Sequence, residues 1–386
     1  MNIAVDVRPV ERPSSRYRGV GLYTRRLCDA LLKRNRCVER PHRFSVITSG
    51  LADSWNGRTS VRRVPAIRKP SRLQWIVDGF FLPRVLKQEE ADIFHATEFT
   101  SIPVSERTKV IPHVYDMIPF LFWDEYSHRI PADYRYALKL ACRRLERAPC
   151  IVTISQHSKN DIAEVTGYAH ERIYVAYPGR PEELDNCKSA ITYSRLNCTA
   201  PTDRGKPYFL YVGGTDVRKN VLFMIRAFAR FAGREQDVQL VLVGDTFTMK
   251  SLPEVAEIFR EIHSLGMADR VVTTGYVDDQ RVRELYRGSV ALIFPSLYEG
   301  FGLPVLEAMT YGAPVVAART SSIPEVLGDT GIYFDPRDED SLVTGMETVY
   351  GHPTRCGDLV ERARQRARLF SWDTVADVVF GIYDQI

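Results

Sequence analysis

The most informative stretch of the chain is Ser296-Leu-Tyr-Glu-Gly-Phe-Gly-Leu-Pro-Val-Leu-Glu-Ala-Met309. It follows the apolar run VALIFPS (290–296), which predicts a buried strand. A helix is expected next, because Pro304 suits the first helical positions, where a missing N–H is harmless. Gly300 and Gly302 let the backbone approach a ligand without a Cβ in the way, and the first amides of the helix suit a phosphate. The stretch therefore predicts a phosphate site between a strand and a helix.

Two carboxylates frame this turn, Glu299 before the glycines and Glu307 one turn into the helix. Helical side chains lean toward the helix N-terminus, so Glu307 can point back at whatever the glycines hold. Amides that can bind a phosphate, glycine backbone without side chains and two carboxylates that can bind hydroxyls together suit a sugar nucleotide. The alternative is a plain strand-to-helix turn followed by a solvated Glu307.

Composition limits the other possibilities. At 386 residues the chain exceeds the roughly 250–300 at which a single core stops growing, so two domains are expected. Charged residues make up 26%, and the net charge of +4 is too small to indicate nucleic-acid binding. The seven cysteines show no C-x-x-C spacing, and we find neither a secretion signal nor an apolar run of about 20 residues. These features predict a cytoplasmic protein with reduced thiols.

Strand and helix patterns alternate along the chain, which predicts an α/β fold with parallel sheets covered on both faces. The expected helices are 23–33, 73–87 and 132–147. The expected strands are 3–7, 44–48, 92–96, 109–116 and 150–155 in the first half and 208–214, 238–244, 271–277, 290–296 and 314–318 in the second. The polar segment between Pro181 and Pro207 predicts the connection between domains over 1–185 and 206–370.

The Glu-x7-Glu spacing with FGLP between the carboxylates resembles the signature of retaining glycosyltransferases of family 4. The resemblance implies the GT-B fold, in which two Rossmann-like, doubly wound parallel-sheet domains face a cleft. The first would bind the acceptor and the second the nucleotide sugar, and a last helix over 371–386 would pack back on the first. The resemblance also implies that Glu299 holds hydroxyls of the donor sugar and Glu307 those of the ribose. The donor would further contact Gly300, Phe301, Gly302 and Leu303.

A second motif, Tyr211-Val-Gly-Gly-Thr-Asp-Val-Arg-Lys-Asn220, follows the first strand of the second half. Arg218 supplies a bidentate fork and Lys219 a mobile point charge, which suits charge growing on a leaving phosphate. The segment resembles the phosphate-binding G-x-x-x-x-R-K-N stretch of the same family, which makes both residues catalytic candidates. Gly214 belongs to the expected donor site and stands where many relatives have Arg. A basic, solvated helix start is the alternative.

A third motif, Ser15-Arg-Tyr-Arg-Gly-Val-Gly-Leu-Tyr-Thr24, follows the first strand of the chain. Gly19 and Gly21 resemble the glycine loop with which the first domain of the family closes over the donor phosphate. A plain loop is the alternative, because G-x-G alone is a weak signal. Arg16 or Arg18 could supply the positive charge that is missing at Gly214.

A fourth motif, His113-Val-Tyr-Asp-Met-Ile-Pro119, ends a strand of the first half. Asp116 resembles the catalytic-site Asp that lines the sugar pocket of the family, and a turn-capping carboxylate is the alternative. Tyr115 stands where many relatives have His, and His113, on the same strand face, could substitute. His95, at the end of another strand, is either a sugar or acceptor contact or a structural histidine.

Tyr276 lies where the family passes the nucleobase, often through main-chain atoms, so the identity of the base stays open. No metal or cofactor is expected besides the nucleotide sugar, because the only D-x-D string, Asp338-Glu-Asp340, suits a helix start. The helix 132–147 is either a solvated basic face or a contact for anionic lipid headgroups or a lipid-linked acceptor at the inner membrane surface. Its basic residues are Arg135, Lys139, Arg143 and Arg147.

Together these features predict a retaining, metal-independent glycosyltransferase. It would move a sugar from a nucleotide diphosphate sugar to a hydroxyl of a glycan or lipid-linked acceptor. The motifs resemble those of GDP-mannose users in bacterial surface polysaccharide assembly, so GDP-mannose is slightly preferred to a UDP-sugar. The alternatives from other classes are a GT-B-like nucleotide-sugar epimerase and a non-catalytic protein that binds sugar nucleotides.

Overall fold

The computed structural model describes residues 1–386 apart from 12–18, 51–54, 56, 68–72 and 182–204 and the side chains of 353–355. The chain divides into two compact units. Unit 1 contains Met1–Gly179 and Ser371–Ile386, and unit 2 contains Arg180–Phe370. The division places the first boundary at Gly179, earlier than the expected 185, and most of the expected connection lies outside the described residues.

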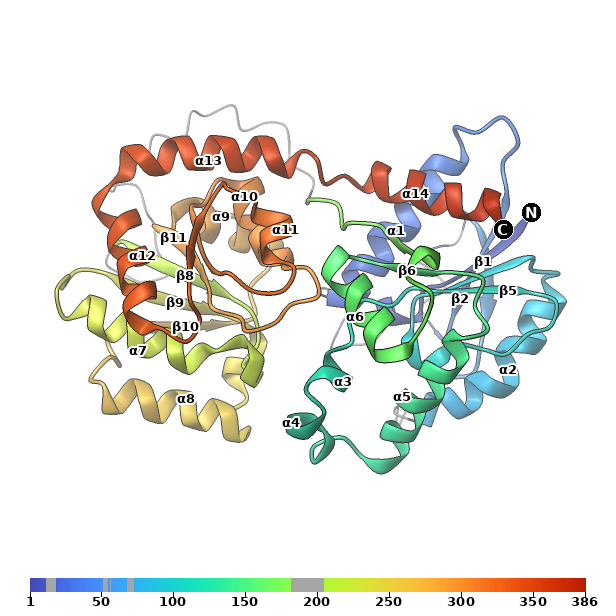
Figure 1. The fold of residues 1–386 in the computed structure, drawn as a ribbon, viewed down its shortest axis with the longest axis horizontal. Coiled ribbons are helices and arrows are strands. Elements are labelled where there is room, and N and C mark those ends of the chain that lie inside the picture. Colours follow the sequence, from blue (N-terminus) through green and yellow to red (C-terminus); the bar gives the residue numbers. More distant parts are fainter. Residues whose placement is uncertain (12–18, 51–54, 56, 68–72, 182–204) are drawn as a thin grey trace. The chain divides into compact units, whose positions relative to one another are not determined.

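Unit 1 is built on a sheet of five strands in the order β3-β2-β1-β4-β5 (Figure 1). These strands pair in parallel throughout. A parallel pair of strands, β6 and β7, is joined to the end of β5 by a bridge between His113 and Val152. The bounds are β1 (Asn2–Asp6), β2 (Arg43–Thr48), β3 (Ser60–Arg63), β4 (Ile93–Ala96), β5 (Lys109–Pro112), β6 (Ile151–Thr153) and β7 (Ile173–Val175).

The longer helices of unit 1 pack around these strands because each has a buried apolar side, whereas the short α3 and α4 bury no apolar residue. They are α1 (Gly19–Asn35), α2 (Gln74–Gln88), α3 (Ile118–Leu121), α4 (Trp123–Ser127), α5 (Ala132–Leu145), α6 (Gln156–Thr166) and α14 (Trp372–Gln385). Short 3-10 turns are η1 (Arg8–Glu11), η4 (Phe99–Ser101) and η5 (His170–Arg172). Within the described parts of both units, no helix is both long and apolar enough to cross a membrane.

Helix α14 comes from the end of the chain and packs against α1. Its buried side carries Val375, Val379 and Tyr383. On the outer side, Lys33 of α1 pairs with Asp373 at 2.8 Å. Exposed pairs contribute little, so the buried apolar side is what holds α14 on unit 1.

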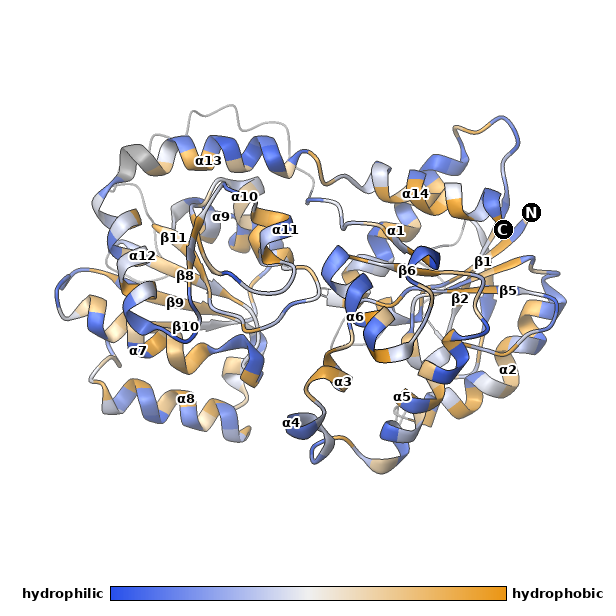
Figure 2. Ribbon diagram, viewed as in Figure 1, coloured by the Kyte–Doolittle hydropathy of each residue, from blue (hydrophilic) through white to orange (hydrophobic). Residues whose placement is uncertain are grey.

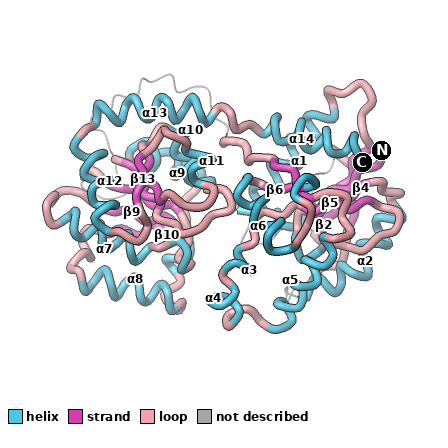
Figure 3. Tube along the Cα trace, in the orientation of Figure 1, coloured by secondary structure: helices cyan, strands magenta, loops and turns pink. Residues whose placement is uncertain are grey.

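Unit 2 has a parallel sheet of six strands in the order β10-β9-β8-β11-β12-β13. Figure 3 draws the strands in magenta. The strands are β8 (Tyr208–Val212), β9 (Gln239–Val243), β10 (Val271–Gly275), β11 (Ala291–Phe294), β12 (Val315–Ala318) and β13 (Ile332–Phe334). The helices are α7 (Val221–Ala232), α8 (Pro253–Ser264), α9 (Asp279–Gly288), α10 (Leu303–Tyr311), α11 (Ile323–Leu327), α12 (Glu339–Gly351) and α13 (Pro353–Ala367), with 3-10 turns η6 (Val217–Lys219) and η7 (Asp245–Thr248). The central strands are buried along their whole length, as their continuous apolar runs require.

The observed elements differ from the expected ones in a few places. Strands β3, β7 and β13 were not expected, because each is short and β3 and β13 are sheet edges. The expected strand 109–116 ends at Pro112. The expected helix start at Asp338 is confirmed, since its carboxylate accepts the Asp340 N–H and caps α12.

The chain passes between the two units twice, after Gly179 and after Phe370. The Arg180 N–H donates to the Phe370 carbonyl oxygen at 2.9 Å. A Cβ at position 179 would come within 2.4 Å of the Trp372 nitrogen, so glycine is needed there. The two crossing points are therefore closely packed segments of chain.

Candidate functional site

The candidate site of unit 2 lies at the switch point of its sheet. From β8 the chain continues to β9 and β10 on one side and then to β11 on the other side. Open parallel sheets bind ligands at such a point, beyond the carboxyl ends of the strands. The segments that follow β8 and β11 are the Arg218–Lys219 motif and the Glu299 turn, and the Leu297 N–H joins them by donating to the Arg218 carbonyl oxygen at 2.7 Å.

Three charged side chains meet at this point. Lys219 Nζ donates to Glu299 Oε1 at 2.6 Å, and Arg218 donates to Glu299 Oε2 at 3.2 Å. Arg218 also donates to the Tyr298 carbonyl oxygen at 3.0 Å, and its Nε lies 3.5 Å from an Asp216 oxygen. The side chains of Arg218, Lys219 and Glu299 retain only 17%, 14% and 10% of their exposure. We call these three residues the ion cluster.

The charges of the ion cluster shift one another's protonation. Burial raises the pKa of Glu299, but the charges of Lys219 and Arg218 outweigh burial and hold this pKa below its usual value. Burial lowers the pKa of Lys219, and the like charge of Arg218 lowers it further, so that the Glu299 carboxylate offsets these effects only in part. The carboxylate of Glu299 has two cationic partners, whereas the ammonium of Lys219 shares its carboxylate partner with Arg218. The lowered pKa of Glu299 is therefore the dominant effect in the ion cluster.

The backbone around Glu299 is fixed by two serines. The Glu299 N–H donates to Ser321 Oγ at 2.9 Å, and the Ser322 hydroxyl donates to the Glu299 carbonyl oxygen at 2.9 Å. Both serines follow β12, the next strand in the sheet. The position of the carboxylate is therefore set by loops from three adjacent strands.

The turn into α10 requires glycine at position 302. Gly302 has a φ of 99°, and a Cβ there would also come within 2.6 Å of Ile323. Helix α10 begins at Leu303 with Pro304 in its first turn, as predicted. Phe301 was expected to contact the donor, but its side chain is 2% exposed and its ring lies 5.8 Å from that of Phe370. Only the backbone of Phe301 remains for a ligand.

Glu307 lies on α10 and accepts a hydrogen bond from the Tyr286 hydroxyl at 2.9 Å. Tyr286 comes from α9 and is completely buried, whereas Glu307 is half-buried. The contact orients one carboxylate oxygen. Glu307 is therefore a half-buried helix residue that is held by a contact from α9.

The remaining expected donor residues of unit 2 differ in their surroundings. Gly214 is tied into the turn after β8, because the Tyr211 hydroxyl donates to its carbonyl oxygen at 2.6 Å. Tyr276 follows β10 and is 55% exposed, which leaves its ring open to solvent. Gly300 lies between the buried residues Glu299 and Phe301.

Unit 1 holds a buried pair of histidines next to α14. His95 Nδ1 lies 2.7 Å from the Tyr383 hydroxyl, and His95 Nε2 lies 3.1 Å from His113 Nδ1. Burial lowers the pKa of His95 to about 4 and lowers that of His113 well below its usual value, so both rings are neutral at pH 7. Both nitrogens of His95 are engaged inside the protein, as the structural alternative for this residue requires.

His113 keeps one nitrogen for other contacts. Its Nε2 is buried and has no hydrogen-bond partner among the described residues. Its ring stacks on that of Tyr115 at 4.8 Å, although β5 ends at Pro112 and Tyr115 lies beyond the strand. Tyr115 shares a hydrogen bond of 3.2 Å with Thr24. Asp116 accepts the Ile118 N–H at 3.0 Å, which is the turn-capping contact that the sequence left as its alternative.

The two glycines of the expected glycine loop both belong to helix α1. Gly19, with a φ of 55°, is the first residue of α1, and Gly21 lies within that helix and is buried. Gly21 was therefore wrongly expected in a loop, because the helix starts four residues before Tyr23. Arg16 and Arg18 lie outside the described residues.

Sequence reasoning missed the residues that support the site. Tyr286, Ser321 and Ser322 each bond to one of the two glutamates. A tyrosine in the mostly polar helix α9 and a Thr-Ser-Ser run after an apolar strand are the signals that could have indicated them.

Two family models match the chain, one for each unit. The family described as Glycosyltransferase Family 4 matches residues 17–184, and Glycosyl transferases group 1 matches residues 199–366. Among curated relatives, the O-antigen chain mannosyltransferase B of Escherichia coli is 27% identical over 64% of each chain. The serotype-specific mannosyltransferase WbdA of Escherichia coli is 30% identical over 73% of this chain and 34% of its own. The chain thus spans less than two thirds of the length of these two relatives.

Solved structures share the fold. Sucrose-phosphate synthase from Thermosynechococcus elongatus superposes with a TM-score of 0.76 at 19% identity, over 100% of this chain and 98% of that chain. Anabaena HepE in complex with UDP-glucose has a TM-score of 0.73 at 18% identity and full coverage of both chains. Since both units match a glycosyltransferase model and the fold extends over the whole chain, this protein belongs to glycosyltransferase family 4 and has the GT-B fold.

Proposed function

We propose that the protein transfers a sugar from a nucleotide diphosphate sugar to a hydroxyl of a glycan or lipid-linked acceptor. The observation that carries this proposal is the ion cluster at the switch point of unit 2, where Arg218 and Lys219 already hold a carboxylate. A diphosphate offers the same cations a stronger anion. Cleavage of the bond at the anomeric carbon adds negative charge to this diphosphate. The two cations therefore stabilise the transition state more strongly than the ground state.

We propose distinct roles for the two glutamates. Glu299, once displaced from Lys219, would accept hydrogen bonds from hydroxyls of the donor sugar. Glu307, oriented by Tyr286, would hold the ribose hydroxyls. The departing phosphate could take the proton of the acceptor hydroxyl, so that no side-chain base is needed. We propose that the reaction retains the anomeric configuration, as the resemblance to family 4 implies. We also propose that it needs no metal, because Arg218 and Lys219 can supply the countercharge.

We propose mannose as the sugar and bacterial surface polysaccharide as the product class. The support comes from the curated relatives, several of which are named as mannosyltransferases, including the O-antigen chain mannosyltransferase RfbU of Salmonella typhimurium. The complex of HepE with UDP-glucose supports a nucleotide-sugar donor and keeps a UDP-sugar as the second candidate. The protein would act in the cytoplasm, where its thiols stay reduced.

The test has a binding step and a transfer step. Thermal unfolding with GDP-mannose and with UDP-sugars should show the larger stabilisation for the true donor, because ligand binding raises stability with the logarithm of occupancy. NMR of the product formed from that donor and a panel of glycan acceptors, in excess EDTA, should show the donor's anomeric configuration. An inverted product or complete loss of activity in EDTA would refute the proposed chemistry. Donor epimerised without acceptor would identify an epimerase, and binding without any reaction would identify a sensor.

A further inference from the structure

Helix α2 of unit 1 exposes an apolar side. Ile76, Phe80 and Phe81 are 39%, 63% and 42% exposed, although phenylalanine is usually buried. The opposite side of the helix buries Leu82 and Leu86 in the core of unit 1. Figure 2 shows the hydrophobic colouring along α2. The helix therefore has apolar residues toward solvent as well as toward the core.

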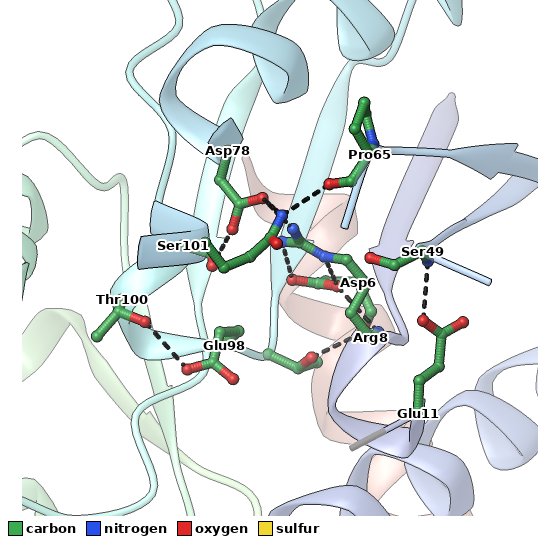
Figure 4. A network of polar contacts seen from close by, with 11 residues as sticks. Asp6, Arg8, Glu11, Ser49, Pro65, Asp78, Glu98, Thr100 and Ser101 are labelled. Atoms are coloured by element: carbon green, nitrogen blue, oxygen red, sulfur yellow. Dashed lines mark hydrogen bonds and ion pairs between the residues drawn. The ribbon is translucent and has the colours of Figure 1, made fainter. Parts of the chain in front are cut away.

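A buried charge network fixes the rotation of α2 (Figure 4). Asp78, which is 1% exposed, accepts hydrogen bonds from Arg8, from the Ser101 hydroxyl and, at 2.8 Å, from Gln74. Arg8 also donates to Asp6 at 2.7 and 2.8 Å. Turning α2 to bury its exposed phenylalanines would pull the Asp78 carboxylate away from Arg8 and leave a buried charge unpaired, which is costly. The apolar side is thus held outward.

Aromatic contacts connect α2 to α5 and α4. The ring of Trp75 lies 5.7 Å from that of Tyr136 on α5, and Tyr136 is 58% exposed. One turn later on α5, Lys139 Nζ lies 5.4 Å from the ring of Trp123, at the start of α4. Next to Trp123, Leu121 of α3 is 40% exposed. Aromatic contacts therefore link α2 to α5 and α5 to the start of α4, and each of these neighbouring regions carries an exposed apolar or aromatic residue.

Basic residues border this apolar strip. Arg84, one turn after Phe80, is exposed and donates to the Phe80 carbonyl oxygen at 2.6 Å. Lys87 on α2 and Lys139 and Arg143 on α5 are exposed as well. Acidic residues lie at the helix ends: Asp124 and Glu125 on α4, the half-buried Asp133 at the start of α5, Glu146 at its end, and Glu89 and Glu90 after α2. Exposed cations thus predominate along α2 and α5.

We propose that this surface docks on an anionic lipid bilayer. Ile76, Phe80, Phe81 and Leu121 would enter the headgroup region, Trp75, Trp123 and Tyr136 would lie at its boundary, and the cations would contact lipid phosphates. We call the surface the lipid face. A second copy of the chain is a poorer occupant, because a twofold interface would bring the same cations against one another.

The lipid face extends the expectation for the basic helix 132–147, which did not include the apolar residues of α2. Arg135 is half-buried, whereas Arg147 is exposed beyond the end of α5. The exposed apolar residues of α2 supply the second kind of attraction, which charge alone does not provide. Binding requires neither donor nor acceptor, so this inference stands or falls separately from the proposed function.

The experiment is co-flotation of the full chain with vesicles of phosphatidylcholine containing phosphatidylglycerol and with vesicles of phosphatidylcholine alone. The wild type should float with the anionic vesicles and lose this binding at high salt or without phosphatidylglycerol. The double variant Lys139→Gln/Arg143→Gln should weaken binding about 25-fold, at about fivefold for each cation. The double variant Phe80→Ser/Phe81→Ser should weaken it by at least about tenfold.

Matched controls lie in unit 2. Leu369→Ser removes an apolar residue that is 70% exposed, and Arg260→Gln removes an exposed cation. Neither control should alter vesicle binding. All variants should keep the wild-type melting temperature within about 2 °C, because exposed side chains are replaced.

Several outcomes would overturn the proposal. These are absence of flotation with anionic vesicles, wild-type binding by the Phe80→Ser/Phe81→Ser variant, and equal losses in the unit 2 controls. Light scattering could instead reveal a dimer that Phe80→Ser dissociates, while no vesicle binding is seen. This result would assign the lipid face to a second copy of the chain.

Discussion

The substitution Glu299→Gln tests whether the carboxylate of the ion cluster holds the place of a substrate diphosphate. In the structure, Lys219 and Arg218 grip this carboxylate at 2.6 and 3.2 Å. An incoming diphosphate must displace it before it can use the same cations. With glutamine at position 299 the cations lose their internal anion. Affinity for inorganic pyrophosphate should then rise about tenfold or more, equivalent to about 1.4 kcal/mol, while sugar transfer falls.

The same substitution should destabilise unit 2. Removing one partner of a buried ion pair costs about 3–5 kcal/mol. The side chains here retain 10–17% of their exposure and glutamine keeps a hydrogen-bond acceptor, so about 2–3 kcal/mol is expected. For a unit of this size the melting temperature should fall by about 5–10 °C.

The pH dependence follows from the lowered pKa of Glu299. The unfolded chain takes up a proton at this group near pH 4.3, before the folded chain does. The stability that Glu299 contributes is therefore complete at neutral pH. It disappears as the pH falls below about 4, through the pKa of the folded state. The melting temperatures of the wild type and of Glu299→Gln should converge in this range.

Calorimetry with pyrophosphate and thermal unfolding measure both effects. Glu307→Gln is the matched control, because it makes the same chemical change at the carboxylate on α10, which accepts a hydrogen bond from Tyr286. It should leave pyrophosphate affinity unchanged. Unaltered or weaker pyrophosphate binding by Glu299→Gln would refute the displacement of carboxylate by diphosphate.

Three further predictions concern other residues of the two units. Glu307→Gln should weaken binding of the free nucleotide by about 1–3 kcal/mol, and unchanged affinity in calorimetry would remove Glu307 from the site. Lys219→Ala should lower turnover more than it weakens nucleoside monophosphate binding, because its charge faces the diphosphate; equal losses for monophosphate and diphosphate would indicate a structural role. Tyr383→Phe should destabilise unit 1 by about 1–3 kcal/mol by leaving a buried His95 nitrogen unsatisfied, which a melting curve measures, and it should change the ¹⁵N shifts of His95 and His113 if the two rings share one hydrogen-bond chain.

Local patterns predicted much of the fold, because each signal lies within one element. Apolar runs marked the buried central strands, and Pro304 and Gly302 marked the start of α10. The edge strand β3 has the sequence SVRR and is not buried, so it lacks the apolar run that indicates a strand. Gly21 was placed outside α1 because it resembles a residue of the family's glycine loop, whereas in the structure it lies within the helix.

Contacts between distant elements could not be predicted in the same way. Which group pairs with Lys219 depends on the adjacency of β8 and β11, which brings Glu299 to it from 80 residues away. The pairing of His95 with Tyr383 spans 288 residues. The exposure of Phe80 depends on how Asp78 anchors α2, whereas the sequence of that helix alone suggests burial.

The return of α14 to unit 1 determines the order in which the protein can be completed during synthesis. Unit 1 begins the chain, yet the helix that covers α1 is translated only after the whole of unit 2. At 5–20 residues per second the ribosome needs roughly 10 to 40 s to make unit 2. Throughout that interval the surface of α1 that will receive Val375 and Val379 stays uncovered. The second unit can therefore finish folding before the first, and the nascent first unit is the part that needs protection from aggregation.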